Sequence, residues 1–252
     1  PDLATADLIY VLDSPGQASA LASYATQLHR LYGVPFRTVI LRRNVGYALA
    51  NNAGASFARG RLLLLLNSDV LPVARGWLST MVDFLDRTPG AGAVGPKLVY
   101  EDESIQHGGM YFVRPEGLPL WENAHYFKGL HRSFPPANVA RLVPAVTGAC
   151  LLLSLDVWSR IGGFTGSYVQ GDYEDSDLCL RLGNLGLETW YLPQAELYHL
   201  EGQSYQTDLR RLTSRFNTWL HTYLWDARIT DLMRPTVESR PSVRPPSPNG
   251  VS

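Results

Sequence analysis

An unbroken run of five leucines, from Leu62 to Leu66, constrains the fold of this 252-residue chain more than any other feature. A run of this length is typical of a strand that is buried on both faces, as strands are inside a parallel sheet. Asn67, Ser68 and Asp69 follow it directly. Polar residues just after such a strand lie at its carboxyl end, where open α/β sheets bind their ligands. The segment therefore predicts a metal and phosphate site, with Asp69 as a ligand for a hard cation.

Strands and helices alternate along the first part of the chain. The stretches with strand character are 8–12, 36–41, 62–66 and 93–96. The stretches with helical spacing are 18–32, 47–59 and 77–86. This alternation predicts an α/β fold with a mostly parallel central sheet, flanked by helices and connected by right-handed crossovers.

The chain becomes less regular after residue 99. Residues 99–141 are rich in Gly, Pro and aromatic residues and have little periodicity, which indicates a long insertion with a hairpin around residues 107–112. Long loops beside a site often carry substrate contacts. Beyond the insertion we expect strands over 145–154, 189–192 and 196–199, and helices over 155–161, 175–185 and 209–224.

The charge and the cysteines exclude several classes of function. The formal net charge of −1 gives no basic surface, so we expect no nucleic-acid partner. Cys150 and Cys179 lie in apolar surroundings without metal-ligand spacing, which mildly favours a reducing compartment. No apolar stretch approaches the roughly 20 residues that span a bilayer. We therefore expect no transmembrane segment in this chain and a cytoplasmic location, either free or peripheral at the inner face of the membrane.

The two ends of the chain differ from its middle. The first residues, from Pro1 to Ala4, include no Met and lead almost at once into a strand, so we expect an N-terminally truncated piece of a longer protein. Residues 234–252 are dense in Pro and Ser, which is typical of a tail or linker. We expect one domain over residues 1–232, a Pro/Ser-rich tail or linker over 233–252, and further domains of the same polypeptide.

Three carboxylates, those of Glu174, Asp175 and Asp177, crowd the start of the helix expected over residues 175–185. Acidic residues in the first turn of a helix favour its macrodipole, so capping is the simpler interpretation. Capping needs fewer acids, however, and crowding raises the pKa of one carboxylate toward the range of a general base. Asp177 and Arg181 are spaced to pair on the helix, which gives Asp177 a structural role. Glu174 and Asp175 are left for chemistry.

Three sites in the sequence allow a structural as well as a functional interpretation. The first is residues 67–69, which also suit a plain polar turn. His199 ends a predicted strand, where an imidazole either packs in the core or completes a mixed oxygen and nitrogen metal shell. The loop from Asn44 to Gly46 precedes a helix N-terminus, a suitable place for an anion, but lacks the glycine pattern of a dinucleotide fingerprint or P-loop. Asn44 either caps the helix or contacts a ligand, and Gly46 either allows a tight turn or lines a pocket.

Short motifs follow one another along the chain in a characteristic order. They are Asp13-Ser14, Arg43-Asn44-Val45-Gly46-Tyr47, Leu65-Leu66-Asn67-Ser68-Asp69-Val70, Val94-Gly95-Pro96-Lys97-Leu98, Ile105-Gln106-His107-Gly108-Gly109, Thr147-Gly148-Ala149-Cys150-Leu151-Leu152, Ile161-Gly162-Gly163-Phe164 and Tyr173-Glu174-Asp175-Ser176-Asp177-Leu178-Cys179-Leu180-Arg181. In this order they resemble the family 2 inverting glycosyltransferases, in particular a subgroup of rhamnosyltransferase-like enzymes of bacterial surface-polysaccharide assembly. The resemblance covers roughly residues 7 to 205, and so many motifs in one order argue against chance.

The resemblance implies a GT-A fold, the fold of nucleotide-diphospho-sugar transferases. It implies a UDP-, dTDP- or GDP-sugar donor, a glycan or lipid-linked glycan acceptor, and Mg²⁺ or Mn²⁺ as cofactor. It also implies that the strand over residues 8–12 matches the second strand of the family. We therefore expect the first strand of the sheet to be missing, which puts the activity of this piece in doubt.

The resemblance implies roles for residues on the donor side. Asp13 matches a residue that contacts the base or ribose, and Asn44 and Gly46 match residues that line the nucleotide pocket. Asn67 and Asp69 occupy the DXD position, with Asp69 as metal ligand and Asn67 on the nucleotide side. Asn67 stands where the family frequently has Asp, so a second carboxylate ligand is in doubt.

The resemblance also implies roles for the reacting groups. Asp175 matches the general base, with Glu174 beside it, and would take the proton of an acceptor hydroxyl that attacks and inverts the anomeric carbon. His199 matches a histidine that joins the metal shell in some members. Thr147 and Gly148 would lie near the acceptor.

Two other functions compete with that of a transferase. A catalytically inactive module of the same fold would bind a nucleotide or sugar, or scaffold a larger assembly, and the missing start and Pro-rich end favour it. A nucleotidyltransferase with a related sheet is disfavoured, because no glycine-rich phosphate loop lies near the N-terminus. Loss of sugar transfer on substitution of Asp69 or Asp175 would separate an enzyme from a module.

Overall fold

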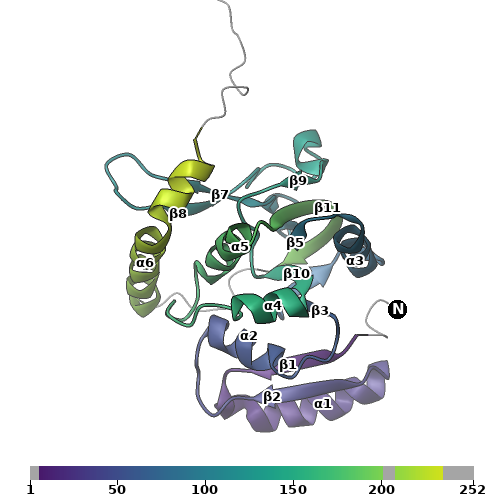
Figure 1. The fold of residues 1–252 in the computed structure, drawn as a ribbon. Coiled ribbons are helices and arrows are strands. Elements are labelled where there is room, and N and C mark those ends of the chain that lie inside the picture. Colours follow the sequence, from purple (N-terminus) through teal and green to yellow (C-terminus); the bar gives the residue numbers. More distant parts are fainter. Residues whose placement is uncertain (1–5, 201–207, 235–252) are drawn as a thin grey trace, which may run out of the picture.

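The computed structural model describes residues 6–200 and 208–234 (Figure 1). It holds a parallel pair of strands near the N-terminus, a central sheet with helices on both faces, and a two-stranded arm. Residues 1–5 and the part of the expected tail after residue 234 lie outside the described residues. Within the described ranges, none of the helices combines the length and apolarity needed to cross a bilayer.

The first layer consists of two strands and the helix between them. β1 (Leu8–Leu12) pairs in parallel with β2 (Phe36–Ile40) along its whole length. A 3-10 turn at Pro15–Gln17 leads into α1 (Ala18–Tyr32), which ends where Gly33 adopts a left-handed conformation with φ of 65°. The predicted strand, helix and helix end are confirmed here.

α2 (Tyr47–Ala55) follows the first layer and packs against β1. A Cβ at Gly54 would lie 2.6 Å from Cγ2 of Val11, so glycine permits the close approach of helix and strand. The helix ends before its expected end at Arg59, because the amides of Phe57 and Ala58 donate to carbonyls three residues earlier and tighten the chain.

The central sheet is mixed. In spatial order its main strands are β3 (Leu62–Leu66), β10 (Cys150–Ser154), β5 (Ala91–Val99), β11 (Glu188–His199) and β4 (Val70–Pro72). β3, β5 and β11 run in one direction, whereas β10 and β4 run in the other. Two short strands extend it, β6 (Ile105–His107) on β5 and β9 (Arg141–Leu142) on β11. The expected helix-flanked α/β sheet is present, but it is mixed rather than mostly parallel.

β10 runs backwards because of the point at which it enters the sheet. Cys150 lies opposite Leu66, so β10 begins at the carboxyl end of β3 and returns along it. A strand is predicted from residue 145, but residues 145–149 form a bridge and a turn instead. The Ala149 carbonyl in this turn accepts the Asn67 amide at 2.9 Å. The segment before β10 is thereby brought beside the polar residues after β3.

Helices cover both faces of the central sheet. α3 (Trp77–Arg87) packs over β5, β10 and β11, and Leu152 enters the core beneath it. α4 (Leu155–Ile161) and α5 (Glu174–Asn184) pack on the opposite face, where Leu151 belongs to the second core. Because successive side chains of β10 enter different cores, this strand is buried on both faces.

The leucine run forms β3 as predicted, but its burial differs from the prediction. Leu63 and Leu65 lie in the core, Leu62 and Leu64 are partly buried, and Leu66 is 39% exposed. Among the described residues β3 pairs only with β10, so no strand covers its other edge. β3 therefore packs on both faces, with Leu63 and Leu65 in one core and Leu62 and Leu64 against the other, but its burial is less complete than predicted, because one edge is open and Leu66 is exposed.

β11 is one strand where two short strands are predicted. A register shift around Pro193 explains the interruption in the sequence pattern, since proline removes a ladder hydrogen bond. The end of β11 reaches the turn after β3, because His199 lies opposite Val70 in β4.

The insertion forms an arm beside the sheet. β7 (Met110–Val113) and β8 (Glu122–His125) pair as an antiparallel hairpin, which extends further along the chain than the expected one. A 3-10 turn at Pro135–Asn138 follows. The last helix, α6 (Asp208–Leu232), lies beside the arm and α5 and extends past its expected end at Leu224 (Figure 1).

Candidate active site

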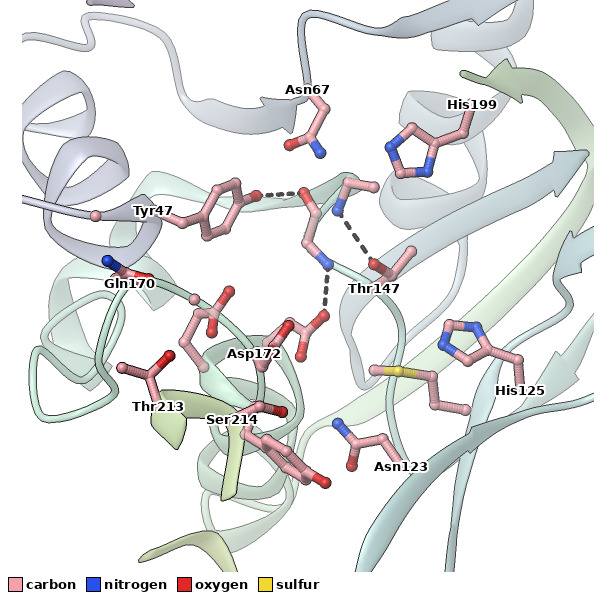
Figure 2. A pocket seen from close by; sticks show the side chains of 18 of the residues that line it. Tyr47, Asn67, Asn123, His125, Thr147, Gln170, Asp172, His199, Thr213 and Ser214 are labelled. Carbon is pink, nitrogen blue, oxygen red and sulfur yellow. Dashed lines mark hydrogen bonds between the residues drawn. The ribbon is translucent and has the colours of Figure 1, made fainter. Parts of the chain in front are cut away.

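A cavity of about 790 Å³ lies at the edge of the central sheet, and its lining includes residues of the arm and of α6 (Figure 2). Most site residues predicted from the sequence line it, namely Asp13, Asn44, Gly46, Asn67, Thr147, Gly148, Glu174, Asp175 and His199. Asp69 is the exception, but its Oδ1 lies 3.4 Å from Nε2 of His199, which is in the lining. The fold therefore brings the predicted residues together around one cavity.

Asp13 holds the loop that precedes α2. Its Oδ1 accepts the Val45 amide at 2.8 Å, and its Oδ2 accepts the Gly46 amide at 2.9 Å. Gly46 is the N-cap of α2 and has a φ of 82°, and a Cβ there would lie 3.0 Å from Cα of Gln170. Asn44 therefore does not cap α2 and lines the cavity instead. The contact of Asp13 with a base or ribose stays a prediction.

Tyr47 joins three segments around the cavity, although it is not among the predicted site residues. Its hydroxyl donates to the Gly148 carbonyl at 2.7 Å, and its amide donates to the Gln170 carbonyl at 2.9 Å. Burial and the nearby carboxylates of Glu174 and Asp175 hold the pKa of Tyr47 well above its ordinary value. The hydroxyl therefore stays protonated as a donor. An aromatic residue at the start of a helix carries no signal that separates this role from core packing.

Asp175 lies in the first turn of α5, and backbone amides orient both of its carboxylate oxygens. Oδ2 accepts the Gly148 amide at 3.0 Å, and Oδ1 accepts the Ser176 amide at 2.7 Å. Burial raises the pKa of Asp175, although these two hydrogen bonds favour its charged form. A fixed carboxylate with a raised pKa is suited to accept a proton.

Glu174 is only 5% exposed, and its Oε2 has no hydrogen-bond partner. Burial, and then the charge of Asp175, raises the pKa of Glu174 well above its ordinary value. Two neighbouring buried carboxylates do not readily ionise together, so a proton retained by Glu174 leaves Asp175 charged. Asp172 also lines the cavity, and sequence reasoning missed it.

Asp177 has the structural geometry that its spacing predicts. Its Oδ2 pairs with Nε of Arg181 at 2.8 Å and accepts the Thr165 hydroxyl at 2.6 Å. The indole of Trp225 donates to Oδ1 at 2.9 Å. Asp177 therefore joins α5 to α6 and does not line the cavity.

Asp69 and His199 form the candidate metal pair. Oε1 of Gln106, which can only accept, lies 2.7 Å from Nδ1 of His199, so Nδ1 carries the proton. With Nδ1 as the donor, the Nε2 lone pair faces the Asp69 carboxylate, an arrangement that suits a cation held between them. An oxygen and an imidazole nitrogen fit Mg²⁺ or Mn²⁺, with phosphate or water as further ligands. Within residues 6–200 and 208–234, no three acidic, histidine or cysteine side chains converge into a metal site.

The arm supplies the opposite wall of the cavity. Asn123 and His125 lie across it from Tyr47 and Gln170 (Figure 2). Nδ1 of His125 lies 2.9 Å from Nδ1 of His107, so one ring donates to the other and ties β8 to β6. Burial, and then His125, lowers the pKa of His107, which keeps this ring neutral. The insertion thus lines the cavity, although its individual residues carry no recognisable signal.

Two more segments complete the lining. Thr147 and Gly148 lie between the two walls, and Oγ1 of Thr147 accepts the Ala149 amide at 3.3 Å (Figure 2). Thr213 and Ser214 of α6 were not predicted, because polar residues near the start of an amphipathic helix suggest a solvated face. The acceptor role of Thr147 and Gly148 stays a prediction.

Comparison with known sequences gives a consistent set of relatives. Residues 5–219 match the family described as glycosyltransferase like family 2. The chain is 36% identical over 183 residues to an uncharacterised protein of Sinorhizobium fredii, across 69% of this chain and 19% of that protein. It is 34% identical over 164 residues to the O-antigen biosynthesis protein RfbC of Myxococcus xanthus, across 64% of this chain and 12% of that protein.

A third relative has a named activity. The chain is 31% identical over 141 residues to an N-acetylglucosaminyl-diphospho-decaprenol L-rhamnosyltransferase of Mycobacterium tuberculosis, across 51% of this chain and 44% of that protein. The matched segments thus span less than half the length of each of these relatives.

Two solved structures share the fold. GalNAc-T7 with UDP, GalNAc and Mn²⁺ superposes with a TM-score of 0.66 at 15% identity, across 90% of this chain and 44% of that chain. The mannosyltransferase PcManGT of Pyrobaculum calidifontis, with GDP-Man and Mn²⁺, gives a TM-score of 0.58 at 19% identity, across 88% of this chain and 55% of that chain. At these identities the likeness establishes the fold alone, and it confirms the expected GT-A fold.

Proposed function

Because the chain belongs to glycosyltransferase-like family 2, we propose that it transfers a sugar from a nucleotide-diphospho-sugar to an acceptor hydroxyl, with inversion. The observation that carries this proposal is the position of Asp175. Its partly buried carboxylate is oriented by two backbone amides and lines the same cavity as Asn44, Asn67 and His199. A base and a phosphate-binding edge in one cavity are the two parts that such a transfer needs.

Asp175 is the proposed general base. It takes the proton of the acceptor hydroxyl while the hydroxyl oxygen bonds to the anomeric carbon. The bond from that carbon to the donor phosphate breaks, and the nucleoside diphosphate leaves with the electron pair. Attack comes from the face opposite the leaving group, so the configuration inverts. Glu174, held protonated by burial, keeps a second negative charge away from the diphosphate.

Asp69 and His199 would hold Mg²⁺ or Mn²⁺ near the donor diphosphate. When bound, such a cation offsets the negative charge that builds on a departing diphosphate. Gln106 contributes by fixing the proton of His199 on Nδ1, which leaves Nε2 free as a ligand. Asn67 adds an amide that can donate to a phosphate oxygen.

The two walls of the cavity divide the substrates between them in this proposal. The loop held by Asp13, with Asn44 and Gly46, faces the nucleotide, whereas Thr147, Gly148 and the arm face the acceptor. We propose a glycan or lipid-linked glycan acceptor in bacterial polysaccharide assembly. The similarity to an O-antigen biosynthesis protein and to a rhamnosyltransferase acting on a diphospho-decaprenol sugar supports this choice.

The test is a transfer assay with UDP-, dTDP- and GDP-sugars, with Mg²⁺ or Mn²⁺, on the wild type and on Asp175→Asn. Loss of a general base should lower the rate by about 10²- to 10⁴-fold while the circular dichroism spectrum stays unchanged. Asp156→Asn is the matched control, because Asp156 is an exposed acid in the first turn of α4 that does not line the cavity.

Two outcomes would contradict the proposal. Full transfer by Asp175→Asn would remove Asp175 as the base. Nucleotide binding in calorimetry without transfer from any donor would favour the inactive module of the same fold.

A further inference from the structure

The segment that leads into the catalytic acids has an unfavourable backbone. We call residues 169–173 the acid-leading loop, since Glu174 and Asp175 follow it directly. Gln170, Asp172 and Tyr173 adopt positive φ values of 63°, 75° and 75°, a backbone region that residues other than glycine rarely adopt. Such conformations persist only where surrounding contacts enforce them, and they cluster at functional sites. The contacts that enforce this loop are therefore of interest.

One side chain of α6 makes most of these contacts. Asn217 is fully buried, and its Nδ2 donates to the carbonyls of Val169 at 3.0 Å and Gly171 at 2.6 Å. Its Oδ1 accepts the Val169 amide at 2.9 Å. Both amide hydrogens and the oxygen of Asn217 are thus used on the backbone of a single loop. They replace the helix or strand partners that this loop lacks.

The acid-leading loop is held from its other side by α2. The amide of Tyr47 donates to the Gln170 carbonyl at 2.9 Å, and Gly46 approaches the same residue closely. Neighbours of Asn217 on the inner face of α6 continue the attachment. Thr218 donates to the Tyr173 hydroxyl at 3.1 Å, and Nε2 of His221 lies 3.1 Å from Oγ of Ser176. The loop therefore bridges the donor side of the cavity and α6.

We propose that Asn217 is a positioning residue: it holds the acid-leading loop in its unfavourable conformation and so sets the position of Asp172 and Asp175 in the cavity. This inference rests on the proposed function, in which Asp175 is the base. A displacement of about 1 Å in a reacting group can cost about 100-fold in rate. Loss of Asn217 should therefore act on the chemical step more than on donor binding, which uses the Asp13 side of the cavity.

The experiment compares Asn217→Ala with Asn52→Ala. Asn52 of α2 is the matched control, because its amide also donates to and accepts from one loop residue, Phe164, at 2.8 and 2.9 Å. Neither Asn52 nor Phe164 lines the cavity. Each variant loses the same kind of side chain to backbone clamp, but only Asn217→Ala frees the loop before the acids.

Two readouts decide the matter. In Asn217→Ala we expect the amides of residues 169–173 to exchange with solvent at least tenfold faster, and kcat to fall at least tenfold with the KM for the donor changed less than threefold. In Asn52→Ala we expect both quantities to stay within twofold of the wild type. Asn217→Ser, which adds no charge and whose shorter hydroxyl can keep at most part of these hydrogen bonds, should lie between Asn217→Ala and the wild type.

Three results would overturn the inference. They are unchanged exchange in the loop of Asn217→Ala, faster exchange with unchanged kcat, and equal losses of kcat in Asn217→Ala and Asn52→Ala. If Asn217→Ala does not fold, the same criteria apply to Asn217→Ser. If the wild type transfers no sugar, the proposed function fails, and the exchange of the loop amides still decides whether Asn217 holds the loop.

Discussion

β1 and β10 are apolar strands of equal length, five residues each, but they lie in very different surroundings. Four successive residues of β10, Cys150 to Leu153, are buried almost completely. In the first layer, by contrast, no residue of β1, α1 or β2 is fully buried, and Tyr10 is 42% exposed. The burial of an apolar strand therefore depends on the elements that pack against its edges and faces, and not on its sequence alone.

The neighbours of the two strands explain this difference. β10 lies between β3 and β5 and is covered by α3 on one face and by α4 on the other. Among the described residues, β1 pairs only with β2 and has α2 as its main packing partner. Asp13 follows β1 in the loosely packed first layer, whereas Asp175 lies in α5, which packs on the central sheet. The two sides of the cavity are therefore held by regions of different packing. We expect the Asp13 side of the cavity to open locally at a lower free energy than the Asp175 side.

The largest expected effect is on the stability of the well-packed region. Leu152→Ala should lower the free energy of unfolding by about 3 kcal/mol, because it leaves a cavity beneath α3 that cannot collapse. Leu12→Ala in β1 removes a partly buried side chain and should cost about 1 kcal/mol. Urea unfolding of both variants measures the two losses. Equal losses would break the comparison between β1 and β10.

A smaller effect is expected from pH, through His221 at the contact of α5 and α6. Burial lowers the pKa of His221 from 6.5 to about 4. The unfolded chain therefore binds this proton more tightly, so stability is complete above pH 6.5 and falls as the pH drops toward 4. Between pH 8 and pH 5 the contribution amounts to about 2 kcal/mol.

The measurement is urea unfolding of the wild type and His221→Gln at both pH values. Raised pKa values at Glu174 and Asp175 act in the opposite sense, but both proteins share them, so the difference between the proteins isolates His221. An identical pH dependence of the two proteins would exclude this role of His221.

The last expected effect is on ligand binding rather than on stability, and it concerns the metal pair, which the central sheet supports. Gln106→Leu removes the acceptor that holds the proton of His199 on Nδ1, and such second-shell losses weaken metal binding about 10- to 100-fold. Calorimetry with Mn²⁺ and a nucleoside diphosphate measures the change. Gln106→Glu retains an acceptor and should retain most of the affinity. If Gln106→Leu binds Mn²⁺ as the wild type does, His199 is not a ligand or needs no orientation.

Much of the fold follows from local pattern. The spacing of Leu21, Ala25 and Leu28 and the glycine at position 33 define α1 with its end, and the leucine run defines β3. These signals are local because helix and strand periods depend on nearby residues. The direction of β10, in contrast, does not follow from local pattern. Residues 145–154 look like one strand, and only the pairing of Cys150 with Leu66 shows where it begins and which way it runs.

The candidate site divides in the same way. Residues whose chemical type is unusual for their position, such as Asp69 after a buried strand or the acids at Glu174 and Asp175, stand out in the sequence. Tyr47, Gln106 and Asn217 do not stand out in the sequence, because aromatic and amide side chains have many structural uses on ordinary strands and helices. Their roles follow from what they contact.

The sequence by itself therefore determined most of the helices and strands, the family resemblance and the acidic and histidine residues of the candidate site, since each of these depends on residue type and near spacing. Tertiary structure alone decided which groups orient them. Asp175 meets the Gly148 amide across 27 residues, Asn217 meets the acid-leading loop across 48, and Gln106 meets His199 across 93. Contacts of such separation arise from the packing of the whole chain, and no local pattern encodes them.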